Sequence, residues 1–108
     1  MNAQLIEVMF NSQDLARSGL GSRDAVELPL RSALAEAGLG AVTGGGTGGG
    51  VAIVDVEVAR ERVPEAIRFL KQQLRQLGVP PSTVLNVEDS EVPIGVYEPW
   101  GDAPSRLD

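Results

Sequence analysis

The stretch VAIVDVEVARERVPEAIRFLKQQLRQLG, residues 51–78, decides the fold of this chain. Its first eight residues alternate between a small or branched apolar set and a second set that includes two acids, which predicts a β-strand with one buried face. The set expected to be buried is Ala52, Val54, Val56 and Val58. After a charged connector at residues 60–62, apolar side chains return every three or four positions, which is typical of an amphipathic helix. A strand followed at once by a helix indicates a mixed α and β domain.

The helical half of this stretch carries start and stop signals. Pro64 suits the first helical position, and Glu65 suits the positive end of the helix dipole. Gly78 supplies the C-terminal stop, which the prolines at residues 80–81 reinforce. The predicted apolar stripe comprises Ala66, Ile67, Leu70, Leu74 and Leu77. Lys71 is expected on the solvent side of this helix.

Further strands are predicted on both sides of residues 51–78. Residues 5–10 alternate in the same way. Residues 39–58 read as two strands joined through a glycine-rich stretch, with six glycines between Gly44 and Gly50. Residues 83–88 form a final strand, and residues 94–97 suit a short fifth one.

The first long helix has an ambiguous start. Asp24 resembles a helix cap, but Pro29 inside a helix removes one hydrogen bond and clashes with the preceding turn. We therefore expect an irregular start and a regular helix over residues 29–37, with a bent helix from Asp24 as the alternative. Residues 11–22 are rich in Asn, Ser, Asp and Gly, which predicts a loop with at most a turn of helix at residues 13–17.

The order of these elements is strand, helix, strand, given twice. It predicts an α+β domain of ferredoxin-like βαββαβ order, with an antiparallel sheet and two helices on one face. The domain is expected to span residues 1–98, and residues 99–108 are expected to form a loosely ordered C-terminal tail.

The amino-acid composition excludes several classes of functional site and partner. The chain has 108 residues, which suits one domain, and a net charge of −6, which disfavours a nucleic-acid partner. It contains neither cysteine nor histidine, so disulfides, thiolate metal sites and the usual proton-transfer side chain are excluded. The N-terminus lacks a signal-peptide pattern, and no apolar run approaches the ~20 residues of a membrane span. We expect a cytoplasmic protein with no membrane partner.

The glycine-rich stretch VTGGGTGGG, residues 42–50, is a candidate binding element. A phosphate-binding loop would need a following lysine and helix, and here a strand follows. The other interpretations are a flexible hairpin tip or bulged edge, and a bare backbone that contacts a partner protein. The candidate ligand-binding residues are Thr43, Gly44, Gly45, Gly46 and Thr47.

Three acids form a second candidate site. If the first and third strands are central in the sheet, Glu7, Asp55 and Glu57 share its uncovered face. Neighbouring carboxylates can bind a divalent cation or raise one another's pKa, so these three are the candidate metal ligands. The alternative is a set of water-facing polar residues. An RNA-binding sheet would instead present aromatic and basic side chains there.

Two aromatic residues near the C-terminus are candidate partner contacts. Tyr97 and Trp100 either fold back over the edge of the core or anchor another protein. With histidine absent, only Lys71 or a perturbed carboxylate could activate a nucleophile. We predict no catalytic residue and no cofactor, and the interpretation leans away from an enzyme.

The run GLGAVTGGGTGG (residues 38–49), followed by an acidic strand and by LKQQLRQLGVPPSTVLNV (residues 70–87), resembles small bacterial ferredoxin-like proteins. The resemblance covers residues 38–87. It implies a ferredoxin-like fold and an immunity or accessory role through partner binding. It transfers no functional residue.

The leading hypothesis is therefore a non-enzymatic protein-binding module, such as an immunity, adaptor or self-associating protein. Its partner would be a second copy, as a homodimer, or another protein, and the negative charge suits a basic one such as a nuclease-type toxin domain. The competing hypothesis is a protein that binds a small ligand or metal, with or without catalysis, through residues 44–50 and the acidic face.

Overall fold

The computed structural model describes residues 3–99. Its elements in chain order are β1 (Ala3–Asn11), α1 (Ser12–Arg17), α2 (Asp24–Ala37), β2 (Gly40–Gly48), β3 (Val51–Ala59), a 3-10 turn (Arg60–Arg62), α3 (Val63–Leu77), β4 (Val84–Val87) and β5 (Ile94–Gly95). The five strands form one antiparallel sheet in the order β2-β3-β1-β4-β5. The predicted α+β class and antiparallel sheet are confirmed.

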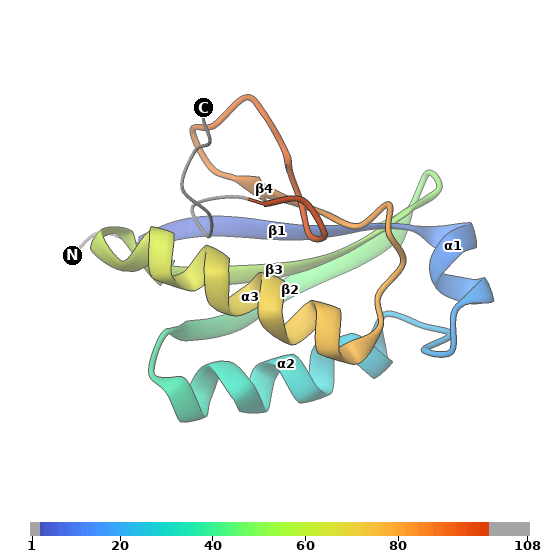
Figure 1. The fold of residues 1–108 in the computed structure, drawn as a ribbon, viewed down its shortest axis with the longest axis horizontal. Coiled ribbons are helices and arrows are strands. Elements are labelled where there is room, and N and C mark those ends of the chain that lie inside the picture. Colours follow the sequence, from blue (N-terminus) through green and yellow to red (C-terminus); the bar gives the residue numbers. More distant parts are fainter. Residues whose placement is uncertain (1–2, 100–108) are drawn as a thin grey trace.

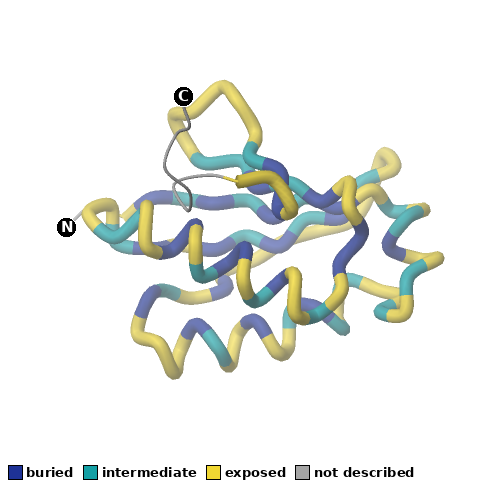
Figure 2. The backbone as a smooth tube through the Cα atoms, viewed as in Figure 1, coloured by how far each residue is buried: buried dark blue, intermediate teal, exposed yellow. Residues whose placement is uncertain are grey.

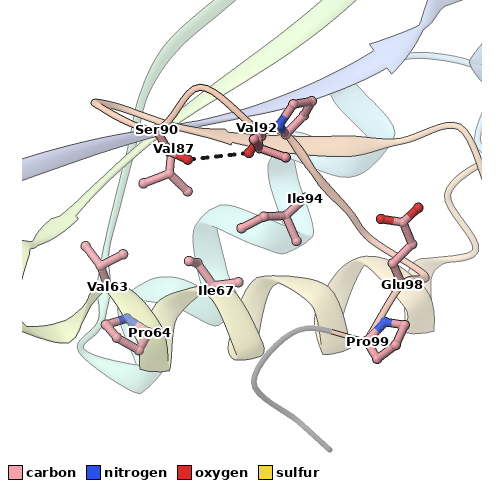
Figure 3. Close-up of a pocket in the computed structure, with 10 residues that line it drawn as sticks. Val63, Pro64, Ile67, Val87, Ser90, Val92, Ile94, Glu98 and Pro99 are labelled. Atoms are coloured by element: carbon pink, nitrogen blue, oxygen red, sulfur yellow. Dashed lines mark hydrogen bonds between the residues drawn. The ribbon is translucent and has the colours of Figure 1, made fainter. Parts of the chain in front are cut away.

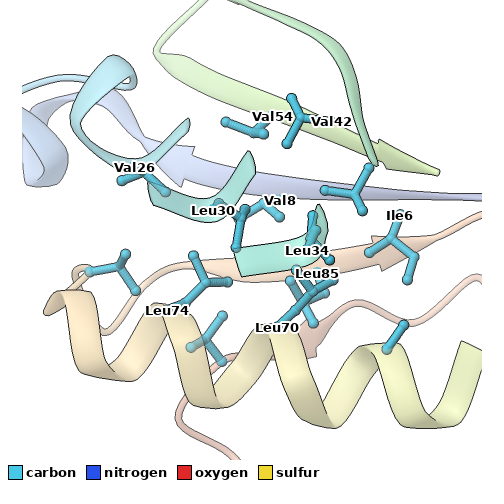
Figure 4. Close-up of a cluster of buried hydrophobic side chains, with 14 of the residues drawn as sticks. Ile6, Val8, Val26, Leu30, Leu34, Val42, Val54, Leu70, Leu74 and Leu85 are labelled. Carbon is cyan, nitrogen blue, oxygen red and sulfur yellow. The ribbon is translucent and has the colours of Figure 1, made fainter. Parts of the chain in front are cut away.

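The two long helices, α2 and α3, pack on the same face of the sheet (Figure 1). Alternate residues of β1 and β3 point toward these helices and are buried, as the sequence pattern predicts. Figure 4 shows their side chains meeting those of α2 and α3, and Figure 2 shows the burial along the chain. Each large aliphatic side chain buried in this way stabilises the fold by about 1.5–3 kcal/mol.

Helix α2 begins earlier than we expected. It starts at Asp24 and includes Pro29, so the regular start near residue 29 is wrong and the alternative start is observed. The Glu27 carboxylate accepts from Arg23 at 2.8 Å and from Arg31 at 2.6 Å, so one ion pair precedes the proline and the other spans it. These contacts and the burial of Val26 compensate for the hydrogen bond that proline removes.

Helix α3 has the predicted boundaries but not the predicted polar face. Lys71 is only 2% exposed, so its placement on the solvent side is wrong. The Lys71 ammonium donates to the Glu98 carbonyl, and Arg75 Nε donates to the Val96 carbonyl at 2.8 Å. The chain after β5 therefore lies against this face of α3, and helical periodicity cannot reveal such a distant segment.

Arg62 links the start of α3 to the end of α2. The Arg62 guanidinium donates to both carboxylate oxygens of Glu65, at 3.1 and 3.0 Å, and to the Gly38 carbonyl at 3.0 Å. This hydrogen bonding lowers the pKa of the Glu65 carboxyl from its ordinary value. The pair is exposed, so it orients the helix ends and contributes little stability.

The glycine-rich stretch, which we expected to join two strands, is itself mostly strand. β2 continues through Gly48, and only Gly49 and Gly50, both with positive φ (59° and 85°), form the turn to β3. The register shifts between Val42 and Gly44, so Thr43 is the extra residue of a β-bulge. The predicted bulged edge is observed, the hairpin tip is confined to Gly49 and Gly50, and contact of the bare backbone with a partner stays a prediction.

The chain ends differ from the expectations in smaller ways. The short fifth strand is present as β5, and α1 extends the expected turn of helix at residues 13–17 by one residue. The predicted tail, residues 99–108, lies outside the described residues except for Pro99. Among residues 3–99, no helix has both the length and the hydropathy that a membrane span requires.

Two neighbouring glycines should respond oppositely to a methyl group. A Cβ at Gly45, where φ is +151°, would lie 2.2 Å from the Ile53 carbonyl oxygen, whereas a Cβ at Gly46 would meet nothing within 4 Å. We expect Gly45→Ala to lower the free energy of unfolding by more than about 1 kcal/mol, and Gly46→Ala to raise it by about 0.5 kcal/mol. Urea denaturation measures both, and equal effects would contradict the local geometry.

Candidate functional site

The outer strand β2 presents an exposed backbone edge. Within residues 3–99, β3 is the only strand that pairs with it, so the groups on its other side are left unpaired. Arg31 covers the first part of this edge, because its guanidinium donates to the Val42 carbonyl at 3.4 Å. Beyond the bulge, residues 44–48 are all exposed and include no charge and no proline. We call residues 44–48 the glycine edge.

The glycines of the glycine edge leave one side of β2 bare. Gly44, Gly46 and Gly48 pair with Asp55, Ile53 and Val51, so they share the sheet face that points away from the helices. A Cβ at Gly46 or Gly48 would meet nothing within 4 Å, and at Gly44 it would lie 3.5 Å from Asp55 Oδ2, an ordinary contact. Local packing therefore does not require glycine at these three positions.

The bare strip borders a row of carboxylates. Asp55 lies beside Gly44 on one side and directly opposite Glu7 on the other, and Glu7 in turn lies opposite Asn86. Like charges directly opposite one another in a sheet repel. Asp55 Oδ1 is buried and has no hydrogen-bond partner among the described residues. This acid row therefore has an unsatisfied acceptor and excess negative charge.

The structure brings together two of the three predicted metal ligands. Glu7 and Asp55 face each other, whereas Glu57 is paired with Leu5 and Ala41 instead. Across residues 3–99, no group of three or more acids is arranged to hold a metal ion. The acid row is thus better suited to a single cationic group than to a cation that needs six or more oxygen ligands.

The predicted ligand-binding residues are spread along a strand. Gly44 and Gly46 face away from the helices, while Gly45 and Thr47 face the helix side, and Thr43 is the bulge residue. These residues do not form a loop whose amides converge on one point, which is how an anion is cradled. Ligand binding through them stays a prediction.

Tyr97 has a structural contact. Its hydroxyl donates to the Val79 carbonyl at 2.6 Å, and the Arg75 guanidinium lies 6.0 Å from its ring centre. The residue is 43% exposed, so part of its surface remains open to a partner. Trp100, the other predicted contact, lies outside the described residues.

An apolar hollow was not predicted from the sequence. It measures about 440 Å³ and lies between the start of α3 and the chain around β5 (Figure 3). Its apolar lining includes Val63, Ile67, Val87, Val92 and Ile94. One hint of it was present in the sequence, the apolar residue Val92 beside Pro93 in a segment without periodic pattern. In the structure Val92 is 72% exposed. The hollow can hold an apolar group, but few polar atoms converge on it.

No family model, no curated protein and no solved structure matches this chain. The candidate site is therefore assessed on its own geometry. The two features that combine exposure with unsatisfied chemistry, the glycine edge and the acid row, are adjacent.

Tyr97→Phe tests the structural role of this residue. Loss of the hydroxyl leaves the buried Val79 carbonyl without its donor, so we expect the free energy of unfolding to fall by about 1 kcal/mol. Thermal and urea denaturation measure the change. Unchanged stability would show that the hydroxyl contributes nothing to the fold.

Proposed function

We propose that this protein is a non-enzymatic protein-binding module that takes up an extended segment of another protein as an additional strand on β2. The observation that carries this proposal is the glycine edge, an exposed run of unpaired strand backbone without a charge or proline to block pairing. The immunity or adaptor role and the cytoplasmic location stay predictions.

The glycine edge suits strand addition on energetic grounds. In such complexes the main-chain hydrogen bonds supply affinity, each contributing about 0.5–1.5 kcal/mol net, and alternate side chains supply specificity. Glycine lets a partner chain approach closely. The sheet behind the edge is rigid, because β3 pairs on its other side with the buried strand β1. A partner strand would therefore join a preformed template.

We also propose that the domain is ferredoxin-like, with β5 added. The order β2-β3-β1-β4 and the positions of α2 between β1 and β2 and of α3 between β3 and β4 support this assignment. In this arrangement β2 is an outer strand, which is what leaves it available to a partner.

The hollow beside α3 supports a second candidate function. Its volume of about 440 Å³ lies in the range of small-molecule sites. An apolar side chain or small apolar ligand would suit its lining. It ranks second because specific ligand sites also place several polar groups toward the ligand.

A peptide-display selection tests strand addition. The probe is a library of unconstrained ten-residue peptides, and the bait is the whole chain. We expect enriched peptides to bind wild type but to lose at least tenfold affinity for Thr47→Pro. Gly48 and Val51 flank the two-residue turn and form a hydrogen-bonded pair, so in the next pair the Thr47 amide points away from β3. Proline at residue 47 therefore removes an outward donor and leaves the β2–β3 hydrogen bonds in place.

The matched control is Val92→Glu, which places a charge at the rim of the hollow and leaves the edge unchanged. Loss of binding in this variant, with Thr47→Pro still binding, would assign the peptide to the hollow and contradict the proposal. Amide hydrogen exchange on wild type gives a readout that does not depend on either variant folding. Strand addition protects the outward-pointing amides of Gly45 and Thr47 when peptide is added, and absence of protection there would overturn it.

A further inference from the structure

We propose that the partner segment carries a lysine or arginine at the position facing Gly44, whose side chain crosses the bare glycine to the Asp55 and Glu7 carboxylates. The residue two positions away, facing Gly46, is aliphatic and rests against Ile53. This inference deepens the proposed function, because it rests on strand addition to β2 and specifies the chemistry of the added strand.

The register places these groups in two parallel rows. One row runs Gly44, Asp55, Glu7 across three strands, and the next runs Gly46, Ile53, Met9. An added strand would extend each row outward by one residue, and residues two apart on it would extend neighbouring rows on the same face. A basic residue and an aliphatic residue at alternate positions therefore match the two rows.

Long side chains on an added strand can reach β3. Neighbouring strands lie about 4.8 Å apart, so the added backbone would run roughly 9.6 Å from β3. Lysine and arginine have long apolar stems that lie along a surface with the charged head at the end. The stem can cross β2 at Gly44 because no side chain stands there, and Asp55 Oδ2 is 3.5 Å from where a Cβ would be.

The acid row favours a cation at this point. None of the ion pairs among residues 3–99 involves Asp55 or Glu7. The incoming cation would meet Asp55 Oδ2, which lies 3.5 Å from where a Cβ at Gly44 would be, and hydrogen bonds between a cation and a carboxylate are among the strong ones. The same cation would reduce the repulsion between the two facing carboxylates. A basic partner segment is thus complementary to the acid row at the position facing Gly44, and also to the net negative charge of the whole chain.

A second copy of this chain does not complement the site by pairing its β2 against β2. β2 has the sequence GAVTGGGTG, which contains no basic residue, so a β2 strand paired against β2 cannot supply the cation. Each copy also has a net charge of −6, which opposes close approach of two chains. On these two grounds we infer that the occupant is a basic segment of another protein, and the oligomeric state is the test for a second copy.

The test repeats the peptide selection with two baits, wild type and Asp55→Asn. On wild type we expect enrichment of Lys or Arg two positions from Ile, Leu or Val. On Asp55→Asn the basic preference should disappear while the aliphatic one persists. For a synthetic basic peptide, Asp55→Asn should weaken binding about fivefold to tenfold at low salt. Replacing the peptide's basic residue with norleucine should weaken binding to wild type by a similar factor, but should cause no further loss of affinity for Asp55→Asn.

Two further variants separate access from charge. Gly44→Leu fills the bare strip and should weaken the basic peptide as much as Asp55→Asn does. Gly19→Leu, a loop glycine with nothing within 4 Å, is the matched control and should bind like wild type. Unchanged binding to Gly44→Leu would contradict a side chain that crosses this position.

The outcomes distinguish this inference from the proposed function. Peptides that bind wild type, fail on Thr47→Pro and show no basic preference would overturn the inference and leave strand addition standing. A dimer by light scattering that Thr47→Pro dissolves would also overturn it, because the occupant would then be a second copy. If no peptide is enriched and the protein is monomeric, both proposals fall.

Discussion

The pairing of β1 with β3 is the constraint on which the rest of the structure depends. These strands are aligned over nine residue pairs, from Ala3–Ala59 to Asn11–Val51. Because side chains alternate between the two faces, a slip of one residue would turn the buried set outward. Burial of Val8 beneath the helices therefore fixes the register, and that register sets Glu7 directly against Asp55. The acid row is a consequence of how the core is packed.

The bulge in β2 determines what lies beside that row. Val42 pairs with Val56, so a regular ladder would place Thr43 opposite Asp55. Its hydroxyl could then donate to the carboxylate. The extra residue moves Gly44 into this position instead, and Asp55 Oδ1 is left without a hydrogen-bond partner among residues 3–99. Bulges often reposition side chains near functional sites, and here the bulge removes one.

The sequence allowed prediction of the elements whose signals are local. Alternation identified β1 and β3, and helix caps bounded α3, because burial on one face imposes those periods. It did not reveal that Lys71 is buried, and it left the start of α2 at Asp24 only as an alternative, since both depend on side-chain contacts that periodicity does not contain. For the site, the residue types were predictable, but the meeting of Gly44 with Asp55 depends on where the bulge lies, and the glycines suggest a bulge without locating it.

The acidic charge bears on the partner and on self-association. An exposed, side-chain-poor edge is a hazard, because identical chains can pair along it. Proteins commonly guard such edges with lysine or proline, and the glycine edge has neither. A net charge of −6 opposes such pairing, because it repels further copies of the chain, and the same charge would attract the basic segment that we propose as partner. Specificity of this kind needs a repulsive element as well as an attractive one, and one charge distribution provides both.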